Sequence, residues 1–179
     1  MRKAIFLIPT CLFCLALAAQ EGNVSKSGRS FVTVDPLSMV MAKPGQNTPV
    51  EFTIHIQPGY HINSNRPSTP ELIPTQLGFS PPMDLIVAKV QYPPGQLSSF
   101  PFSPEEKLSV YSGDIKIKAV LMAQRNAGSG NYTVHGELKY QACDNNSCYP
   151  PKKVPVQFDV NVAKAAGKRR GNAQSPHIH

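Results

Sequence analysis

Cys143 and Cys148 are the residues whose type and spacing best suit chemistry, because they lie at the two feet of a short polar loop. A disulfide between them would close a ring of about six residues, and in the chain-entropy model such a ring contributes roughly 2 kcal/mol to stability. A ring of a hundred residues contributes about 4.7 kcal/mol. The position is therefore a poor place for a stabilising bridge, and it favours a pair that is used for reversible thiol–disulfide chemistry.

The spacing predicts a hairpin, in which residues on either side of the turn face each other with Cα atoms about 5.5 Å apart. That separation suits a disulfide, and residues 144–147 are small and polar, so the loop can stay exposed to a partner. A purely structural bridge fits the bare pattern as well. Zinc fits it less well, because two thiolates without a nearby histidine fill only half of a tetrahedral shell. We expect no metal and no cofactor beyond the cysteine pair.

The start of the chain is typical of a secretion signal. Arg2 and Lys3 precede an apolar run over residues 4–17, and residues 16–18 supply a small-x-small cleavage pattern. The run is shorter than the ~20 residues of a membrane span, although an uncleaved anchor is the alternative. Cleavage would remove Cys11 and Cys14 and leave the later pair in an exported compartment, where disulfides persist. We therefore expect a periplasmic or secreted protein.

Composition and charge indicate one domain with polar ends. The formal charge is +7, and much of the excess lies in four basic residues between Lys164 and Arg170, a pattern typical of a solvated tail. No basic stripe is interleaved with aromatics, so we expect no nucleic-acid binding. The predicted organisation is a signal peptide at 1–18, a polar leader at 19–30, a domain at 31–162 and a basic, polar, disordered tail at 163–179.

Eighteen prolines and the scarcity of helical periodicity indicate an all-β fold. Apolar and polar residues alternate with the period of a half-buried strand. The segment from Leu97 to Leu108 places Phe100 and Phe102 among prolines and acids, and we expect it to be irregular. Strands without intervening helices fit an antiparallel sandwich. The expected strands are 31–34, 38–42, 50–56, 76–79, 85–92, 115–121, 132–140 and 154–162, with 60–63 following a turn and 110–113 returning the chain to the body.

Tyr-Gln-Ala-Cys at 140–143, followed by Cys-Tyr-Pro-Pro at 148–151, resembles the cysteine signature of one family, the N-terminal periplasmic domain of the thiol:disulfide interchange protein DsbD. Pro-Gly-Tyr-His-Ile-Asn at 58–63 resembles its Gly-Tyr/Trp-His-Ile segment. Leu-Ser-Val-Tyr-Ser-Gly at 108–113 resembles the segment after its cap loop. The resemblance runs from about Val32 to Val162.

The resemblance implies an immunoglobulin-like β-sandwich that carries electrons as a dithiol. It implies a membrane-embedded electron donor and clients that are thioredoxin-fold periplasmic proteins. Cys148 would be the thiol that engages the client disulfide, and Cys143 the less exposed thiol that resolves the mixed disulfide. The residues leave open whether the chain is an enzyme in its own right, as a protein-disulfide reductase component.

The resemblance also implies a cap over the cysteine pair, formed by the excursion from Phe100 to Glu106. Phe102 is the expected capping ring, with Phe100 as the alternative. His61 is a further candidate for the pocket, whereas His55 is expected at the surface. Lys152 and Lys153 would favour a thiolate or simply begin an exposed strand, and Asp144, Glu105 and Glu106 would tune the thiols or be surface charges. The residues expected to line the pocket around the sulfurs are Tyr60, Ile62, Tyr111 and Tyr149.

The chain departs from the best-known members in three ways. Those members are fused to transmembrane helices and a thioredoxin domain, so we expect this domain to stand alone, as a monomer that relies on separate proteins. Its cysteines have four intervening residues, one fewer than theirs. It has His61 and Asn63 where they have a second tyrosine. The alternatives are a non-catalytic, secreted immunoglobulin-like binding module with a structural disulfide, and a metal-binding domain that uses His177 and His179.

Overall fold

The computed structural model describes residues 30–165, which form β-strands and contain no helix. Twelve strands are arranged in three sheets of four strands. No helix within this range could cross a membrane. The predicted signal peptide, the leader up to residue 29, and the tail beyond residue 165 with His177 and His179 lie outside the described residues.

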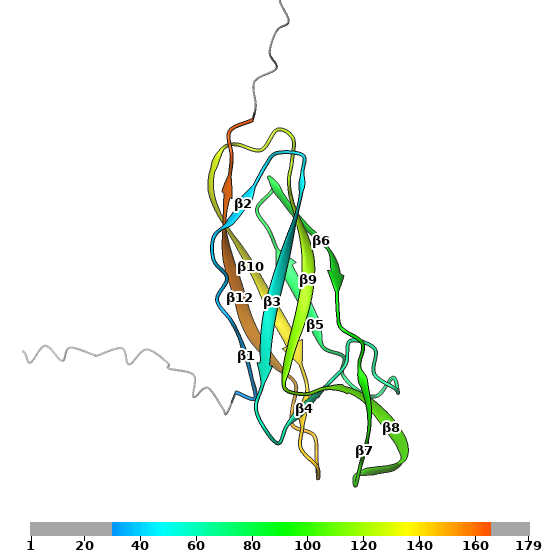
Figure 1. The fold of residues 1–179 in the computed structure, drawn as a ribbon. Helices are drawn as coiled ribbons and strands as arrows, with labels where there is room; N and C mark the ends of the chain where they lie inside the picture. Colours follow the sequence, from blue (N-terminus) through cyan, green and yellow to red (C-terminus); the bar gives the residue numbers. More distant parts are fainter. Residues whose placement is uncertain (1–29, 166–179) are drawn as a thin grey trace, which may run out of the picture.

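The first layer is a sheet in which all ladders are antiparallel (Figure 1). Its central strands show the expected alternation, because Phe52 and Ile54 point into the core while Glu51 is exposed. A register shift between Ala88 and Gln91 marks an irregularity in its edge strand. In spatial order, its strands are β1 (Val32–Val34), β3 (Asn47–Ile56), β9 (Asp114–Ala123) and β6 (Leu85–Gln91).

The second layer packs against the first and is built on the long pairing of β10 with β12. The β2–β12 ladder is the one parallel pairing among the named strands of residues 30–165. Phe52 of the first layer lies 5.2 Å from Phe79 and 5.6 Å from Phe158 of the second, measured between ring centroids. These contacts join the layers into one core. In spatial order, the strands are β2 (Val40–Ala42), β12 (Lys152–Val162), β10 (Gly130–Tyr140) and β5 (Gln76–Ser80).

These two layers confirm the predicted all-β, immunoglobulin-like β-sandwich. The alternating segments at 50–56, 115–121, 132–140 and 154–162 all fall within strands, as expected. The segment between Asn63 and Pro74 contains no named strand. The fold therefore follows from the period-two pattern, which buries one face of each sheet.

A third, smaller sheet lies at the end of the sandwich and carries the cysteines (Figure 1). The expectation that residues 97–108 are irregular is wrong, because β7 and β8 pair as an antiparallel hairpin from Gln96 to Tyr111. The hairpin projects from the body, so its exposed side chains lack the burial alternation that marks a strand. In spatial order, the strands are β11 (Ala142–Cys143), β4 (His61–Asn63), β8 (Ser103–Tyr111) and β7 (Gln96–Phe100).

The connection between β3 and β4 is a tight turn that sets the place of His61. The Tyr60 amide donates to the Gln57 carbonyl at 3.1 Å, and Gly59 between them has φ of 84°. Pro58 followed by a glycine of positive φ is the pattern of a type II turn, in which a residue with a Cβ at the glycine position would be strained. The turn therefore carries the chain from the first layer into the third sheet.

Candidate functional site

The two cysteines are joined by a disulfide across the foot of a short hairpin. The Tyr149 amide donates to the Ala142 carbonyl at 2.8 Å, and the Asp144 amide donates to the Ser147 carbonyl at 3.0 Å. The cysteine pair lies between these hydrogen-bonded pairs, so it is a non-hydrogen-bonded pair, which is the closer kind. The Cα atoms are 3.9 Å apart, closer than the expected 5.5 Å, because that value belongs to the hydrogen-bonded kind.

Asp144 organises the loop between the cysteines. Its Oδ1 accepts hydrogen bonds from the amides of Asn146 and Ser147 at 2.8 and 2.9 Å, and its Oδ2 accepts one from the Tyr149 hydroxyl at 2.8 Å. These donors, the Asn146 amide first, hold the pKa of Asp144 below its usual value. The same contact with the carboxylate raises the pKa of Tyr149 to about 12. The loop is thus fixed by a charge-assisted network at the site.

The two sulfurs differ in exposure. Cys143 is 0% exposed, whereas Cys148 is an exposed residue. Both stand at the edge of the third sheet, on a hairpin that projects from the end of the sandwich (Figure 1). A partner can therefore reach Cys148 directly, while Cys143 is reached through the bridge.

His61 stands directly opposite Cys143 in the β4–β11 ladder. Because Cys143 is also paired with Cys148, the three residues form a row across neighbouring strands. Directly opposed residues in an antiparallel ladder project from the same face, with Cβ atoms about 4.5–5.5 Å apart. The structure therefore brings His61 to the disulfide. Burial lowers the pKa of the His61 imidazole, and the charge of Asp144 opposes that shift.

The hairpin of β7 and β8, here called the cap hairpin, covers His61 with two aromatic rings. Phe100 stacks on the imidazole with centroids 3.9 Å apart and planes at 16°. Phe102 stacks on Phe100 at 5.4 Å and lies 6.3 Å from the His61 centroid. Phe100 is therefore the inner ring and Phe102 the outer one, and both are half-buried. The exposed acids Glu105 and Glu106 lie on β8.

Tyr60 and Tyr149 are brought together edge to face, with ring centroids 6.0 Å apart, and a third ring packs on both. Phe31 lies 4.7 Å from Tyr60 and 4.6 Å from Tyr149, measured between centroids. Tyr60 precedes His61 and Tyr149 follows Cys148, so alternation directs them away from the face that carries the sulfurs. The aromatic cluster thus supports the hairpin from its other face.

Ile62 and Tyr111 belong to the sandwich core. Ile62 pairs with both Ala142 and Tyr111, one position out of phase with the Cys143–His61 pair, so it faces away from the sulfurs. The Tyr111 hydroxyl donates to Asn65 Oδ1 at 2.6 Å and accepts from the Asn65 amide at 3.3 Å. The Tyr111 hydroxyl also lies 3.0 Å from the Pro93 carbonyl. Tyr111 therefore secures the root of the cap hairpin rather than lining the sulfur pocket.

Sequence reasoning missed a polar network on the face of the cysteines. Asn63 Nδ2 donates to the Ile73 carbonyl at 3.0 Å and to Gln141 Oε1 at 3.2 Å, and Gln141 Nε2 donates to the Tyr149 carbonyl at 3.2 Å. Asn63 is 0% exposed, and its side-chain amide links β4 through hydrogen bonds to Ile73, in the loop after β4, and to Gln141, at the start of the cysteine hairpin. The sequence feature that could have indicated this network is the departure at His61 and Asn63 from the pattern of the best-known members.

The two lysines after the hairpin contact Phe31 and Glu137. Lys152 Nζ lies 5.1 Å from the centroid of the Phe31 ring, and Lys153 Nζ lies 2.7 Å from Glu137 Oε1. Lys153 is exposed near the start of β12. In the described part of the chain, no three His, Cys, Asp or Glu side chains are grouped to hold a metal ion.

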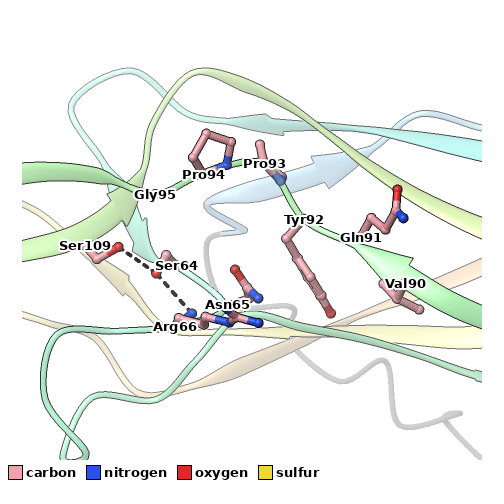
Figure 2. Close-up of a pocket in the computed structure, with 10 residues that line it drawn as sticks. All are labelled: Ser64, Asn65, Arg66, Val90, Gln91, Tyr92, Pro93, Pro94, Gly95 and Ser109. Carbon is pink, nitrogen blue, oxygen red and sulfur yellow. Dashed lines mark hydrogen bonds between the residues drawn. The ribbon is translucent and has the colours of Figure 1, made fainter.

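An open groove of about 590 Å³ lies at the root of the cap hairpin (Figure 2). Figure 2 shows the Ser64 hydroxyl between Ser109 Oγ, at 2.9 Å, and the Arg66 amide, at 3.1 Å. Gly95 packs so closely on Ser109 and Ser64 that a Cβ there would lie 2.2 Å from Ser109 Oγ. Neither cysteine lines this groove; the disulfide lies at the edge of the third sheet instead.

A sandwich that carries a hairpin disulfide between one exposed and one buried cysteine has the arrangement that thiol–disulfide exchange requires. Residues 29–160 match the family described as the N-terminal part of the thiol:disulfide interchange protein DsbD. Because this match spans most of the chain, the chain belongs to that family, which confirms the resemblance seen in the sequence. A comparison with curated proteins gives no match.

Similar solved structures include two of DsbD from Neisseria meningitidis. The N-terminal domain in the reduced form is 18% identical, with a TM-score of 0.41 over 62% of this chain and 76% of that one. The complex between the DsbD and PilB N-terminal domains is 20% identical, with a TM-score of 0.38 over 62% of this chain and 73% of that one. The seventh ScaB type I cohesin from Pseudobacteroides cellulosolvens is 13% identical, with a TM-score of 0.45 over 83% of this chain and 99% of that one.

Proposed function

We propose that the chain is an exported electron carrier that works through the Cys143–Cys148 pair. It passes electrons from a membrane-embedded or thioredoxin-like donor to thioredoxin-fold proteins of the periplasm. Membership of the DsbD N-terminal family supports thiol–disulfide exchange and the periplasmic location. The proposal includes cleavage of residues 1–18 and action as a monomer.

The unequal exposure of the sulfurs is the observation that carries the proposal. Thiol–disulfide exchange requires an attacking sulfur that a partner can reach and a second sulfur that resolves the intermediate. Cys148 meets the first requirement because it is exposed, and Cys143 meets the second because it is buried beside it. A bridge kept only for stability needs neither property.

The reaction consists of two displacements. The Cys148 thiolate attacks one sulfur of the client disulfide, which forms a Cys148–client bond and releases a client thiolate. The Cys143 thiolate then attacks Cys148 Sγ, which forms the intramolecular disulfide and releases the second client thiolate. The client gains the electron pair that the dithiol loses. A donor dithiol reverses both steps and restores the reduced carrier.

Trapping of the intermediate tests the proposal. Cys143→Ser keeps the attacking sulfur but removes the resolving one, so incubation of the reduced variant with a thioredoxin-fold disulfide protein should accumulate a mixed disulfide, detected by mass spectrometry. Cys148→Ser should form none and should not reduce the client. If both variants reduced the client at the wild-type rate, the mechanism would be wrong; if neither the wild type nor Cys143→Ser reacted with the client, the binding module with a structural disulfide would be the better description.

A further inference from the structure

The His61 imidazole carries a buried nitrogen that nothing satisfies. His61 is 4% exposed, and its Nε2 finds no hydrogen-bond partner within residues 30–165. Buried polar atoms are nearly always hydrogen-bonded, so an exception requires an explanation. The stacked Phe100 ring adds to the burial and offers Nε2 no conventional acceptor or donor. The histidine is therefore held in a costly place for a reason other than packing.

The ladder register supplies that reason. His61 faces Cys143 across β4 and β11, and Cys143 faces Cys148 across the hairpin. In the oxidised form the Cys143 sulfur is bonded to its partner and has no proton to donate. After reduction the same sulfur becomes a thiol, which is a donor. The thiol would then face, across the ladder, the histidine whose Nε2 has no hydrogen-bond partner among residues 30–165.

We propose that His61 is the proton acceptor for the Cys143 thiol in the resolving step, an inference that rests on the proposed function. The His61 Nε2 takes the proton from the Cys143 S–H bond as the sulfur turns nucleophilic. The thiolate attacks Cys148 Sγ, the bond between Cys148 and the client breaks, and the client thiolate leaves with the electron pair. The imidazolium then returns its proton to that thiolate or to water.

The surroundings keep the imidazole suited to this role. A base must be neutral before the reaction, and desolvation by burial lowers the pKa of His61. Asp144, on the cysteine hairpin, is the charged group whose field opposes that shift, and it favours the imidazolium once the proton arrives. The cap hairpin presents Phe100 and Phe102 to the ring. A buried thiol without an acceptor would have a raised pKa and would resolve slowly.

The test uses a symmetrical aromatic disulfide, dithiobis(nitrobenzoate), mixed with the reduced protein in a stopped-flow spectrometer. The first nitrothiobenzoate released reports attack by Cys148, and the second reports resolution by Cys143. His61→Phe keeps a buried, stackable ring but removes the acceptor. General-base catalysis is worth about 10²–10⁴-fold, so we expect at least a tenfold slower second phase near neutral pH. The first phase should stay within about twofold of wild type.

The controls separate this inference from the proposed function. His135→Phe changes an exposed histidine on β10 and should leave both phases unchanged. The pH profile of the second phase should lose its lower inflection in His61→Phe alone, which a packing defect would not cause. A second phase with wild-type rate and pH profile in His61→Phe overturns the role of His61 while the exchange function stands. Absence of both phases in the wild type overturns the exchange function and this inference with it.

A measurement on the wild type keeps the inference falsifiable if His61→Phe does not fold. Nitrogen NMR of labelled histidine distinguishes an Nε2 that accepts a hydrogen bond from one that does not. We expect the His61 Nε2 signal to shift on reduction of the disulfide, and the His135 signals to stay in place. An unchanged His61 signal would mean that the thiol and the imidazole do not interact.

Discussion

The Phe100 ring lies flat on the His61 imidazole, with centroids 3.9 Å apart and planes inclined by 16°. The cap hairpin therefore meets the redox site at the histidine opposite Cys143, and this histidine links the cap to the sulfurs. Access to Cys148 does not depend on this stack, because Cys148 is already exposed.

Phe100→Ala should raise the pKa of His61, because loss of the ring admits water to a nitrogen whose charged form is disfavoured by burial. A proton NMR titration of the histidine ring signals measures the change. Leu97→Ala is the matched control, since Leu97 is on the same hairpin but 67% exposed. An unaltered His61 titration in Phe100→Ala would show that the cap does not control solvation of the site.

Asp144→Asn should lower the pKa of Tyr149 from about 12 toward the ordinary tyrosine value, because the amide removes the negative charge beside the phenol. Titration of the tyrosine Cζ signal by carbon NMR, assigned with Tyr149→Phe, follows the shift. Asp159→Asn is the control, because this carboxylate accepts a hydrogen bond from Thr133 and does not belong to the cysteine hairpin. A Tyr149 pKa that stayed near 12 would contradict the hydrogen bond between the two side chains.

Asp144 should also make the free energy of unfolding depend on pH in the acidic range. Its folded pKa lies below the ordinary value, so its contribution is present above the unfolded pKa and is lost as the pH falls through the folded pKa. Urea unfolding of wild type and Asp144→Asn between about pH 2 and 6 should show the curves converge at the acidic end. A stability gap that stayed constant across this range would exclude the charge as its source.

His55 should stabilise the first layer in its protonated form. Its Nδ1 lies 2.7 Å from Asp114 Oδ1 and its Nε2 lies 2.9 Å from Asp35 Oδ1, and these contacts, Asp114 first, raise its pKa. The contribution is fully present below the unfolded pKa of about 6.5 and is lost as the pH rises through the raised folded pKa. His55→Gln should therefore be destabilising in mild acid and nearly neutral at alkaline pH, as measured by urea unfolding; an effect that did not change with pH would contradict the ion pairs as its source.

Tyr111→Phe should destabilise the protein by about 1–3 kcal/mol, because Asn65 and the Pro93 carbonyl lose the hydroxyl of a buried side chain as their hydrogen-bond partner. Denaturant unfolding monitored by circular dichroism measures the loss. Leu97→Ala on the exposed side of the same hairpin should stay within about 0.5 kcal/mol of wild type. Equal stabilities of Tyr111→Phe and wild type would mean that the hydroxyl does not hold the root of the hairpin.

The sandwich could be predicted because burial of one face leaves a period-two pattern in segments such as Val50–Ile56. The cysteine hairpin could be predicted because its turn is local. The cap hairpin could not be predicted, because its sequence does not alternate between apolar and polar residues. It contains Pro101, Pro104 and the exposed acids of β8. The position of His61 opposite Cys143 depends on a register between distant segments, and no local pattern records that register.

The reduction potential of the Cys143–Cys148 disulfide tests the central claim most directly. The measurement is an equilibrium titration of the folded protein against dithiol and disulfide buffers, with the redox state read by thiol alkylation and mass spectrometry. A carrier that opens and closes its bridge should have a potential in the range of exchange proteins, roughly −120 to −270 mV. A value below about −300 mV, with the sandwich intact in both redox states, would identify a structural bridge and contradict the account.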